Sequence, residues 1–240
     1  MGPKSNSLFH FTKSVTFLKG ILEGGFLPRY CLEDTRYLSI DYIGYPMVCF
    51  CDIPISRISE HTAFYGDYGL GMTKEWGIKN SLAPLLYTPP TGALNDLANY
   101  LFKLEMTDSA GASTPEQETL NQHFFRLISM VKPISGNMVV AGTVVEKDFH
   151  EENEWRFVPK KFDLLFRENF DANRDTENAK VADERLAFVP ADVRYIFVKK
   201  DAEIPMIFDF IQNNLGHFPL NEIKILTSRI VSLETLGRDV

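Results

Sequence analysis

The chain has 240 residues, a formal net charge of −7 and 45% hydrophobic residues. This composition is ordinary for a folded protein and excludes a collagen-like or largely disordered chain. The acidic balance argues against a broad nucleic-acid or anionic-membrane interface, because both need a basic surface.

The first predicted elements alternate between strands and helices. A strand over 8–12 precedes a helix that begins after its N-cap Ser14 and ends at Gly24 and Gly25. The next predicted elements are a strand at 47–53, a helix at 58–65, a strand at 70–73, a turn or helix at 74–79 and a strand at 85–88.

The second half shows the same mixture. Its predicted elements are helices at 94–105 and 115–130 around a loop at 107–114, strands at 138–145, 155–158, 193–198 and 223–226, and a helix from Pro205 to Gly216. Residues 167–185 are charged and poor in branched aliphatic residues, so we expect a flexible surface excursion there. Because strands and helices mix without a regular β–α–β rhythm, the sequence predicts an α+β fold, with mixed sheets and flanking helices in one domain over 1–240.

His10 is the first candidate site residue. On its predicted strand it shares a face with Thr12, whereas Phe9 and Phe11 point to the opposite face. A polar face on a strand beside the core often lines a cleft. The alternative is a hydrogen-bonded histidine with a purely structural role.

The segment 61–71 combines three glycines with two tyrosines, Tyr65 and Tyr68. Glycines permit a close approach of the backbone, and tyrosine rings offer flat faces for stacking. Together they can hold a planar ligand, although a tight turn with aromatic packing explains them equally well. No phosphate loop or dinucleotide fingerprint occurs in the chain.

Two carboxylates and a guanidinium follow one another at Glu152, Glu154 and Arg156. If a strand starts here, the three share one face. Arg156 can then hold Glu154 ionised, and an ionised carboxylate in a cleft stabilises a positively charged, oxocarbenium-like sugar centre. The alternative is a charged strand edge.

The cysteines raise the question of a metal. Cys31, Cys49, Cys51 and His61 have the atoms for a tetrahedral zinc site. However, Cys49 and Cys51 lie on an apolar strand, where cysteines behave as small hydrophobic residues. We therefore expect no metal and keep a small zinc protein as an outside alternative.

Cysteine content and hydropathy also bear on localisation. Three cysteines are too few for a disulfide framework and favour a reducing compartment. No stretch reaches the roughly 18 apolar residues of a membrane helix, and residues 1–6 have no apolar signal region. We expect a soluble cytoplasmic protein without a membrane partner.

Several long runs of the sequence are unusual enough to compare with known families. Those at 8–12, 28–34, 45–54, 65–77 and 152–159 resemble the AbiGi family of abortive-infection, phage-resistance proteins. The resemblance is dense over roughly the first 90 residues. It implies a role in phage defence, and the family's label is the antitoxin of a two-gene system.

The order of the motifs is similar, more broadly, to ADP-ribosyltransferases, among them DNA-modifying toxins of the DarT kind. This resemblance implies an ADP-ribosyltransferase-like fold and NAD as a substrate. It implies that His10, with Thr12 beside it, binds the NAD ribose, and that Tyr65 or Tyr68 stacks on nicotinamide. The Ser-Thr-Ser turn of one major branch of these enzymes is absent.

The same resemblance assigns the two carboxylates. Glu154 would bind the ribose and stabilise the oxocarbenium-like state, and Glu152 would orient the acceptor. The function implied is a mono-ADP-ribosyltransferase or NAD-cleaving enzyme of phage defence. A nucleic-acid acceptor is not favoured by the acidic charge, although a single strand needs only a short basic groove.

A non-catalytic role on the same scaffold is the alternative, because a fold does not establish catalysis. The chain would then be an antitoxin or sensor that binds a partner toxin or a phage component. The surfaces expected to bind such a partner are the charged 167–185 excursion and the helical region 94–130.

Overall fold

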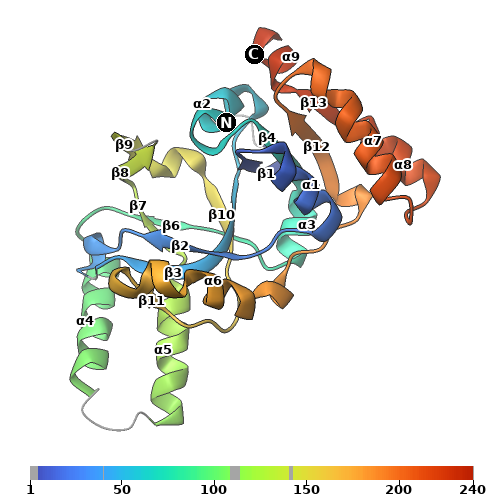
Figure 1. Ribbon diagram of the computed structural model, residues 1–240. Helices are drawn as coiled ribbons and strands as arrows, with labels where there is room; N and C mark the ends of the chain where they lie inside the picture. The colour runs from blue at the N-terminus through green and yellow to red at the C-terminus, as the bar shows by residue number, and fades with distance from the viewer. Residues whose placement is uncertain (1–4, 40, 109–113, 141–142, 240) are drawn as a thin grey trace.

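The computed structural model describes residues 5–39, 41–108, 114–140 and 143–239 (Figure 1). The fold is α+β, as predicted, and is built on a nine-stranded mixed sheet. The sheet runs β13-β12-β4-β1-β3-β10-β5, with β2 and β11 also paired to β3. Over the described residues, β12 and β13 are the only strands of this sheet that pair in parallel. Two small two-stranded sheets, β6-β7 and β8-β9, lie beside it.

The strands and helices are bounded as follows. The strands are β1 (Ser7–Thr12), β2 (Arg29–Glu33), β3 (Ile43–Cys51), β4 (Tyr68–Thr73), β5 (Ala83–Pro84), β6 (Leu86–Thr88), β7 (Val131–Pro133), β8 (Ser135–Val140), β9 (Thr143–Asp148), β10 (Glu154–Phe157), β11 (Leu165–Phe166), β12 (Val193–Val198) and β13 (Ile230–Ser232). The helices are α1 (Val15–Gly24), α2 (Ile58–Tyr65), α3 (Lys74–Lys79), α4 (Ala93–Asp108), α5 (Pro115–Ile128), α6 (Phe170–Lys180), α7 (Ile204–Asn214), α8 (Leu220–Thr227) and α9 (Leu233–Asp239). None of them, over the residues described, is long and apolar enough to cross a membrane.

Helix α1 forms where the sequence predicts it. The Ser14 hydroxyl accepts a hydrogen bond from the Phe17 N–H, which satisfies one of the unpaired donors of the first turn. Gly25 ends the helix with a φ of 79°, a backbone conformation that favours glycine. Leu18 and Leu22, one turn apart, are buried against the sheet.

The largest core cluster lies between the sheet and four helices. The strands contribute residues such as Phe50 and Leu70, and the covering helices are α1, α3, α7 and α8.

The strand expected at 223–226 is wrong, because Leu220–Thr227 form α8. Ile223, Leu226 and Thr227 are buried at helical spacing, so a helix buries this apolar set on one face.

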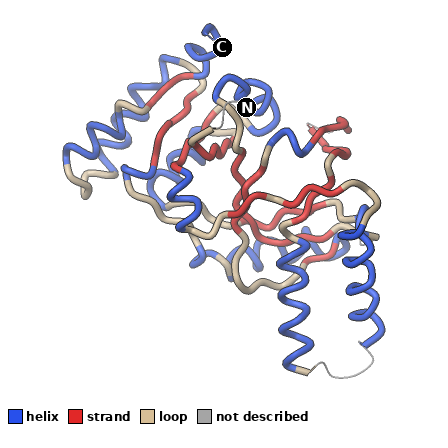
Figure 2. Tube along the Cα trace, turned by 180° about the vertical axis from the view of Figure 1, so that it is seen from behind, coloured by secondary structure: helices blue, strands red, loops and turns tan. Residues whose placement is uncertain are grey.

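Helices α4 and α5 form a hairpin that projects from the body of the molecule (Figures 1 and 2). A capping box between Thr114 and Gln117 begins α5. The predicted loop at 107–114 overlaps the end of α4, and its residues 109–113 lie outside the described part of the chain. The prediction of a single strand at 138–145 is wrong: residues 138–140 lie on β8 and residues 143–145 on the antiparallel β9, while 141 and 142 lie outside the described part of the chain.

Residues 167–185, predicted as a surface excursion, contain helix α6. Phe170 and Val181 are buried with Tyr30 of β2. The side-chain oxygen of Asn178 accepts a hydrogen bond of 2.8 Å from the Tyr30 N–H. These contacts attach α6 to the sheet, and the flexibility of the segment stays a prediction.

Candidate functional site

The main sheet has an interrupted pairing along β3. Strand β1 pairs with β3 only where Phe9 faces Cys51, whereas β2 pairs with residues 43–47 of β3. Residues 48–50 pair with β10 alone. At this interruption His10 Nδ1 lies 2.9 Å from the Cys49 carbonyl oxygen. A side chain therefore takes the place of a strand partner.

A cavity of about 1470 Å³ borders this interruption. Its walls come from α1, β1, β2, β3, α2, β7, β8 and β10. Ligand pockets usually measure roughly 300–1,000 Å³, so the space is large enough for a dinucleotide.

The cavity gathers residues that lie far apart in the sequence. Five of the six predicted site residues line it: His10, Thr12, Tyr65, Glu152 and Glu154. The sixth, Tyr68, does not, and its hydroxyl donates a hydrogen bond of 2.8 Å to Glu203 Oε1. The sequence left the two tyrosines undecided, and only Tyr65 lies at the cavity.

His10 is held in a defined orientation. A carbonyl oxygen can only accept, so Nδ1 carries the hydrogen that it donates to Cys49. Burial lowers the pKa of His10, against the opposing effect of this hydrogen bond, and the ring is neutral at pH 7. The rings of Phe26 and Phe50 pack against it, with centroids 5.2 and 5.5 Å away. Nε2 is thus free to accept a hydrogen bond from a ligand hydroxyl.

Glu154 is a deeply buried carboxylate of the site, and it has 5% of its surface exposed, as does Glu152. Its Oε1 accepts a hydrogen bond of 2.9 Å from Arg156 Nε, and its Oε2 one of 2.7 Å from Lys132 Nζ. Burial alone would raise the pKa of Glu154, but the charges of Arg156 and Lys132 outweigh it and hold the pKa well below its usual range. Glu154 is therefore ionised, with Arg156 in the position that the sequence predicted.

Glu152 differs from its expected position. It ends a 3₁₀ turn, Phe149–Glu152, and Asn153 with a φ of 44° separates it from β10. The prediction that Glu152 lies on the same strand as Glu154 is wrong, because the strand starts at Glu154. The Oε1 atom of Glu152 nevertheless accepts hydrogen bonds from the Tyr65 hydroxyl at 2.6 Å and from Lys147 Nζ at 2.5 Å.

Lys132 joins the two carboxylates. Its Nζ lies 3.3 Å from Glu152 Oε2 as well as 2.7 Å from Glu154 Oε2. Burial would raise the pKa of Glu152, but Lys132 and the hydrogen bonds from Lys147 and Tyr65 lower it. Both carboxylates are thus ionised while remaining buried.

The charges of this cluster balance. Its ion pairs join three carboxylates to three cations: Glu33, Glu152, Glu154, Lys132, Lys147 and Arg156. Lys132 and Lys147 are not among the residues predicted from the sequence. Each lies on a short strand outside the main sheet, and no local pattern distinguishes it from a solvent-exposed lysine.

The cysteines have a different environment from that of a metal site. Burial raises the pKa of the Cys49 and Cys51 thiols well above the usual value, so both stay protonated. His61 packs on the Tyr65 ring, with centroids 4.4 Å apart. Within the described residues, no group of three or more His, Cys, Asp or Glu side chains could hold a metal ion. Cys31, Cys49, Cys51 and His61 therefore do not form such a group.

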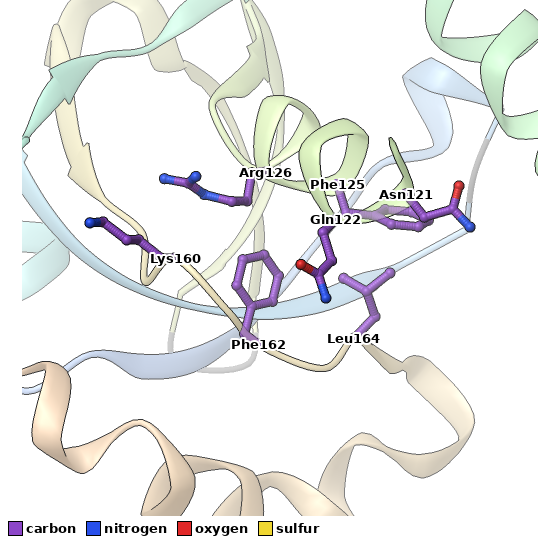
Figure 3. A pocket seen from close by; sticks show the side chains of 7 residues that line it. All are labelled: Asn121, Gln122, Phe125, Arg126, Lys160, Phe162 and Leu164. Atoms are coloured by element: carbon purple, nitrogen blue, oxygen red, sulfur yellow. The ribbon is translucent and has the colours of Figure 1, made fainter. Parts of the chain in front are cut away.

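A second, much smaller cavity lies beside α5 (Figure 3). Its volume is about 100 Å³, too small for a nucleotide. Seven residues line it, none of them among the predicted site residues, although the first four lie in the helical region expected to bind a partner: Asn121, Gln122, Phe125, Arg126, Lys160, Phe162 and Leu164.

Comparisons with known proteins agree on one family. The family model that matches residues 24–199 is described as "Putative abortive phage resistance protein AbiGi, antitoxin". The "Abortive phage resistance protein AbiGi" of Lactococcus lactis subsp. cremoris is 27% identical over 249 residues, which covers 89% of this chain and 99% of that protein. No solved structure matches the chain.

Proposed function

The chain belongs to the AbiGi family of abortive phage resistance proteins, and we propose that its large cavity binds NAD and cleaves the bond between nicotinamide and ribose. One observation carries this proposal. The resemblance to ADP-ribosyltransferases names residues from three separate regions of the sequence, and five of them line a single cavity. Nothing in their local sequence requires this convergence.

The chemistry of the cavity wall suits a nucleotide sugar. His10 Nε2 and the Thr12 hydroxyl can bond to ribose hydroxyls, and the Tyr65 ring provides an aromatic surface for nicotinamide. The volume of about 1470 Å³ leaves room for the rest of the dinucleotide.

The ionised carboxylates supply the reactivity. When the glycosidic bond breaks, its electron pair leaves with the nicotinamide nitrogen and positive charge develops on the ribose. Glu154 stabilises that charge, because it is held deprotonated before the reaction starts. Glu152 accepts the proton of the attacking nucleophile, a water or an acceptor group, as the new bond to the ribose carbon forms.

The test compares the wild type with Glu154→Gln. Glu154 is buried rather than exposed at a strand edge, so alanine would leave a hole and unpaired cations. Glutamine keeps the shape and removes the charge. We expect calorimetry to detect NAD binding to both proteins, and nicotinamide release by the variant to fall about 100-fold or more.

A matched control is Glu203→Gln. Glu203 also accepts a tyrosine hydrogen bond, but it does not line the cavity. This variant should release nicotinamide at the wild-type rate. A wild type that neither binds NAD nor releases nicotinamide would overturn the proposal.

Binding of a partner toxin is the second candidate function, and the α4–α5 hairpin favours it. The hairpin projects from the body and carries large exposed apolar side chains: Leu97, Tyr100, Leu120 and Leu127. Exposed apolar clusters often mark protein interfaces. Expression of the chain alone separates the two functions. Growth arrest that is lost in the Glu154→Gln variant supports an enzyme. Rescue of cells from a co-expressed toxin that does not depend on Glu154 supports an antitoxin.

A further inference from the structure

Helix α1 forms part of the wall of the large cavity, and it carries an exposed aromatic ring there. Phe17 is 63% exposed and lines the cavity together with Thr16, Gly20 and Ile21. This spacing places the four residues on one face of the helix. A Cβ added at Gly20 would meet no atom within 4 Å, so the surface one turn from Phe17 is open. The ring therefore has a free face for a flat ligand.

A cation without a counter-ion lines the same cavity. Arg36 pairs with Asp34, and Lys132 and Arg156 belong to the buried charge cluster. Arg29, the exposed first residue of β2, has neither an ion pair nor a side-chain hydrogen bond within the described residues. A guanidinium binds phosphate oxygens through two parallel hydrogen bonds, which makes Arg29 suited to a phosphate group.

Arg29 is also well separated from Glu154. It faces Met47 across the β2–β3 pairing, and Glu154 faces Cys51 across the β3–β10 pairing. These two positions are four residue steps apart along β3, or about 13 Å of strand. A phosphate at Arg29 thus avoids the negative charge of Glu154, and a dinucleotide is long enough to reach both.

We propose that Phe17 and Arg29 form the subsite for the ADP half of the dinucleotide. Phe17 stacks on the purine and Arg29 binds a phosphate. The assignment rests on the proposed function for the position of the nicotinamide half. Substrates that lack the purine, such as nicotinamide mononucleotide, would lose the Phe17 contact.

The test measures the binding of ADP and of adenosine by calorimetry. Arg29→Gln should weaken ADP binding about tenfold or more and leave adenosine binding unchanged, because adenosine has no phosphate. Phe17→Ala should weaken both ligands about tenfold, since both contain the purine. Arg194→Gln and Phe208→Ala are matched controls, because both side chains are exposed and lie outside the cavity wall.

The outcomes separate this inference from the proposed function. If both variants bind ADP more weakly, as expected, but the wild type releases no nicotinamide from NAD, the subsite stands and the proposed reaction fails. If the wild type cleaves NAD and neither variant alters ADP binding, the reaction stands and the subsite is wrong. A wild type that does not bind ADP would also overturn the subsite.

Discussion

Lys132 and Glu154 form a buried ion pair with 2.7 Å between Nζ and Oε2. Lys132 lies on β7 of a separate two-stranded sheet, whereas Glu154 begins β10 of the main sheet. The ring of Phe149 lies 4.6 Å from the same Nζ and shields the pair. The ion pair therefore connects two sheets that, over the residues described, share no strand pairing, and it fixes the carboxylate at the cavity wall.

Replacement of Lys132 by methionine should destabilise the protein. The change leaves Glu152 and Glu154 with one cation fewer in a buried setting, although Lys147 and Arg156 remain. Removing one partner of a buried pair costs about 3 kcal/mol, and we expect a loss of this order in the free energy of unfolding. Urea unfolding followed by circular dichroism measures it.

The control for this substitution is Arg57→Met. Arg57 pairs with Glu60 and Glu151 at the surface, where an ion pair contributes at most about 1 kcal/mol. Equal losses of unfolding free energy in the two variants would show that the buried cluster contributes no more to stability than a surface ion pair does.

Stability should depend on His61 in mildly acidic solution. Burial lowers the pKa of His61 from 6.5 to about 4, against the raising effect of Glu152. At pH values between these two pKa values, the unfolded chain binds more protons than the folded one. The free energy of unfolding therefore falls as the pH drops. From pH 6.5 to 4.5 the contribution of this one group is about 2 kcal/mol.

His61→Gln removes this titration. His10, whose pKa is also lowered by burial, stays in the variant and retains its own pH dependence. The variant should therefore lose less stability than the wild type when unfolding is measured at pH 6.5 and at pH 4.5. The same pH dependence in both proteins would contradict the lowered pKa of His61.

Elements with local signals could be predicted from the sequence. The N-cap Ser14 and the terminal Gly25 of α1 act through neighbouring residues, so their effect is visible in a short window. Helix α2 has the predicted bounds, and Gly66, with a φ of 115°, ends it. Strand β12 likewise has the predicted bounds, because its β-branched and aromatic residues favour a strand.

The remaining features depend on contacts between distant residues. Helix α8 has a short apolar run that suits a strand or a helix, and packing against the core decides between them. Lys132 becomes a buried cation only because two carboxylates some 20 residues later in the chain fold onto it. Single-sequence patterns do not encode such pairings, so the carboxylates could be identified and their lysine partners could not.

Asn178 should matter for the attachment of α6 to the sheet. Asn178→Ala leaves the buried Tyr30 N–H without its acceptor, which costs about 1–3 kcal/mol. Asn173→Ala on the same helix, where the side chain bonds to Asn169 at the surface, should change stability by less than about 0.5 kcal/mol.

Amide hydrogen exchange would also report whether 167–185 is flexible: fast exchange of α6 in the wild type would support the prediction made from its composition.

The two tyrosines that the sequence left undecided give a matched pair of variants. The Tyr65 hydroxyl donates to Glu152 at the cavity, and the Tyr68 hydroxyl donates to Glu203 away from it. Replacing either by phenylalanine removes one hydrogen bond to a carboxylate and should cost a similar stability, about 1–2 kcal/mol.

Only Tyr65→Phe should alter the proposed reaction. It leaves Glu152 with its lysine partners but without the hydroxyl that orients Oε1, so kcat/KM for nicotinamide release should fall about tenfold. Tyr68→Phe should release nicotinamide at the wild-type rate, because its hydroxyl contacts nothing at the cavity. A larger loss in Tyr68→Phe than in Tyr65→Phe would place the reaction outside this cavity, since stability changes alike in both variants and cannot account for the difference.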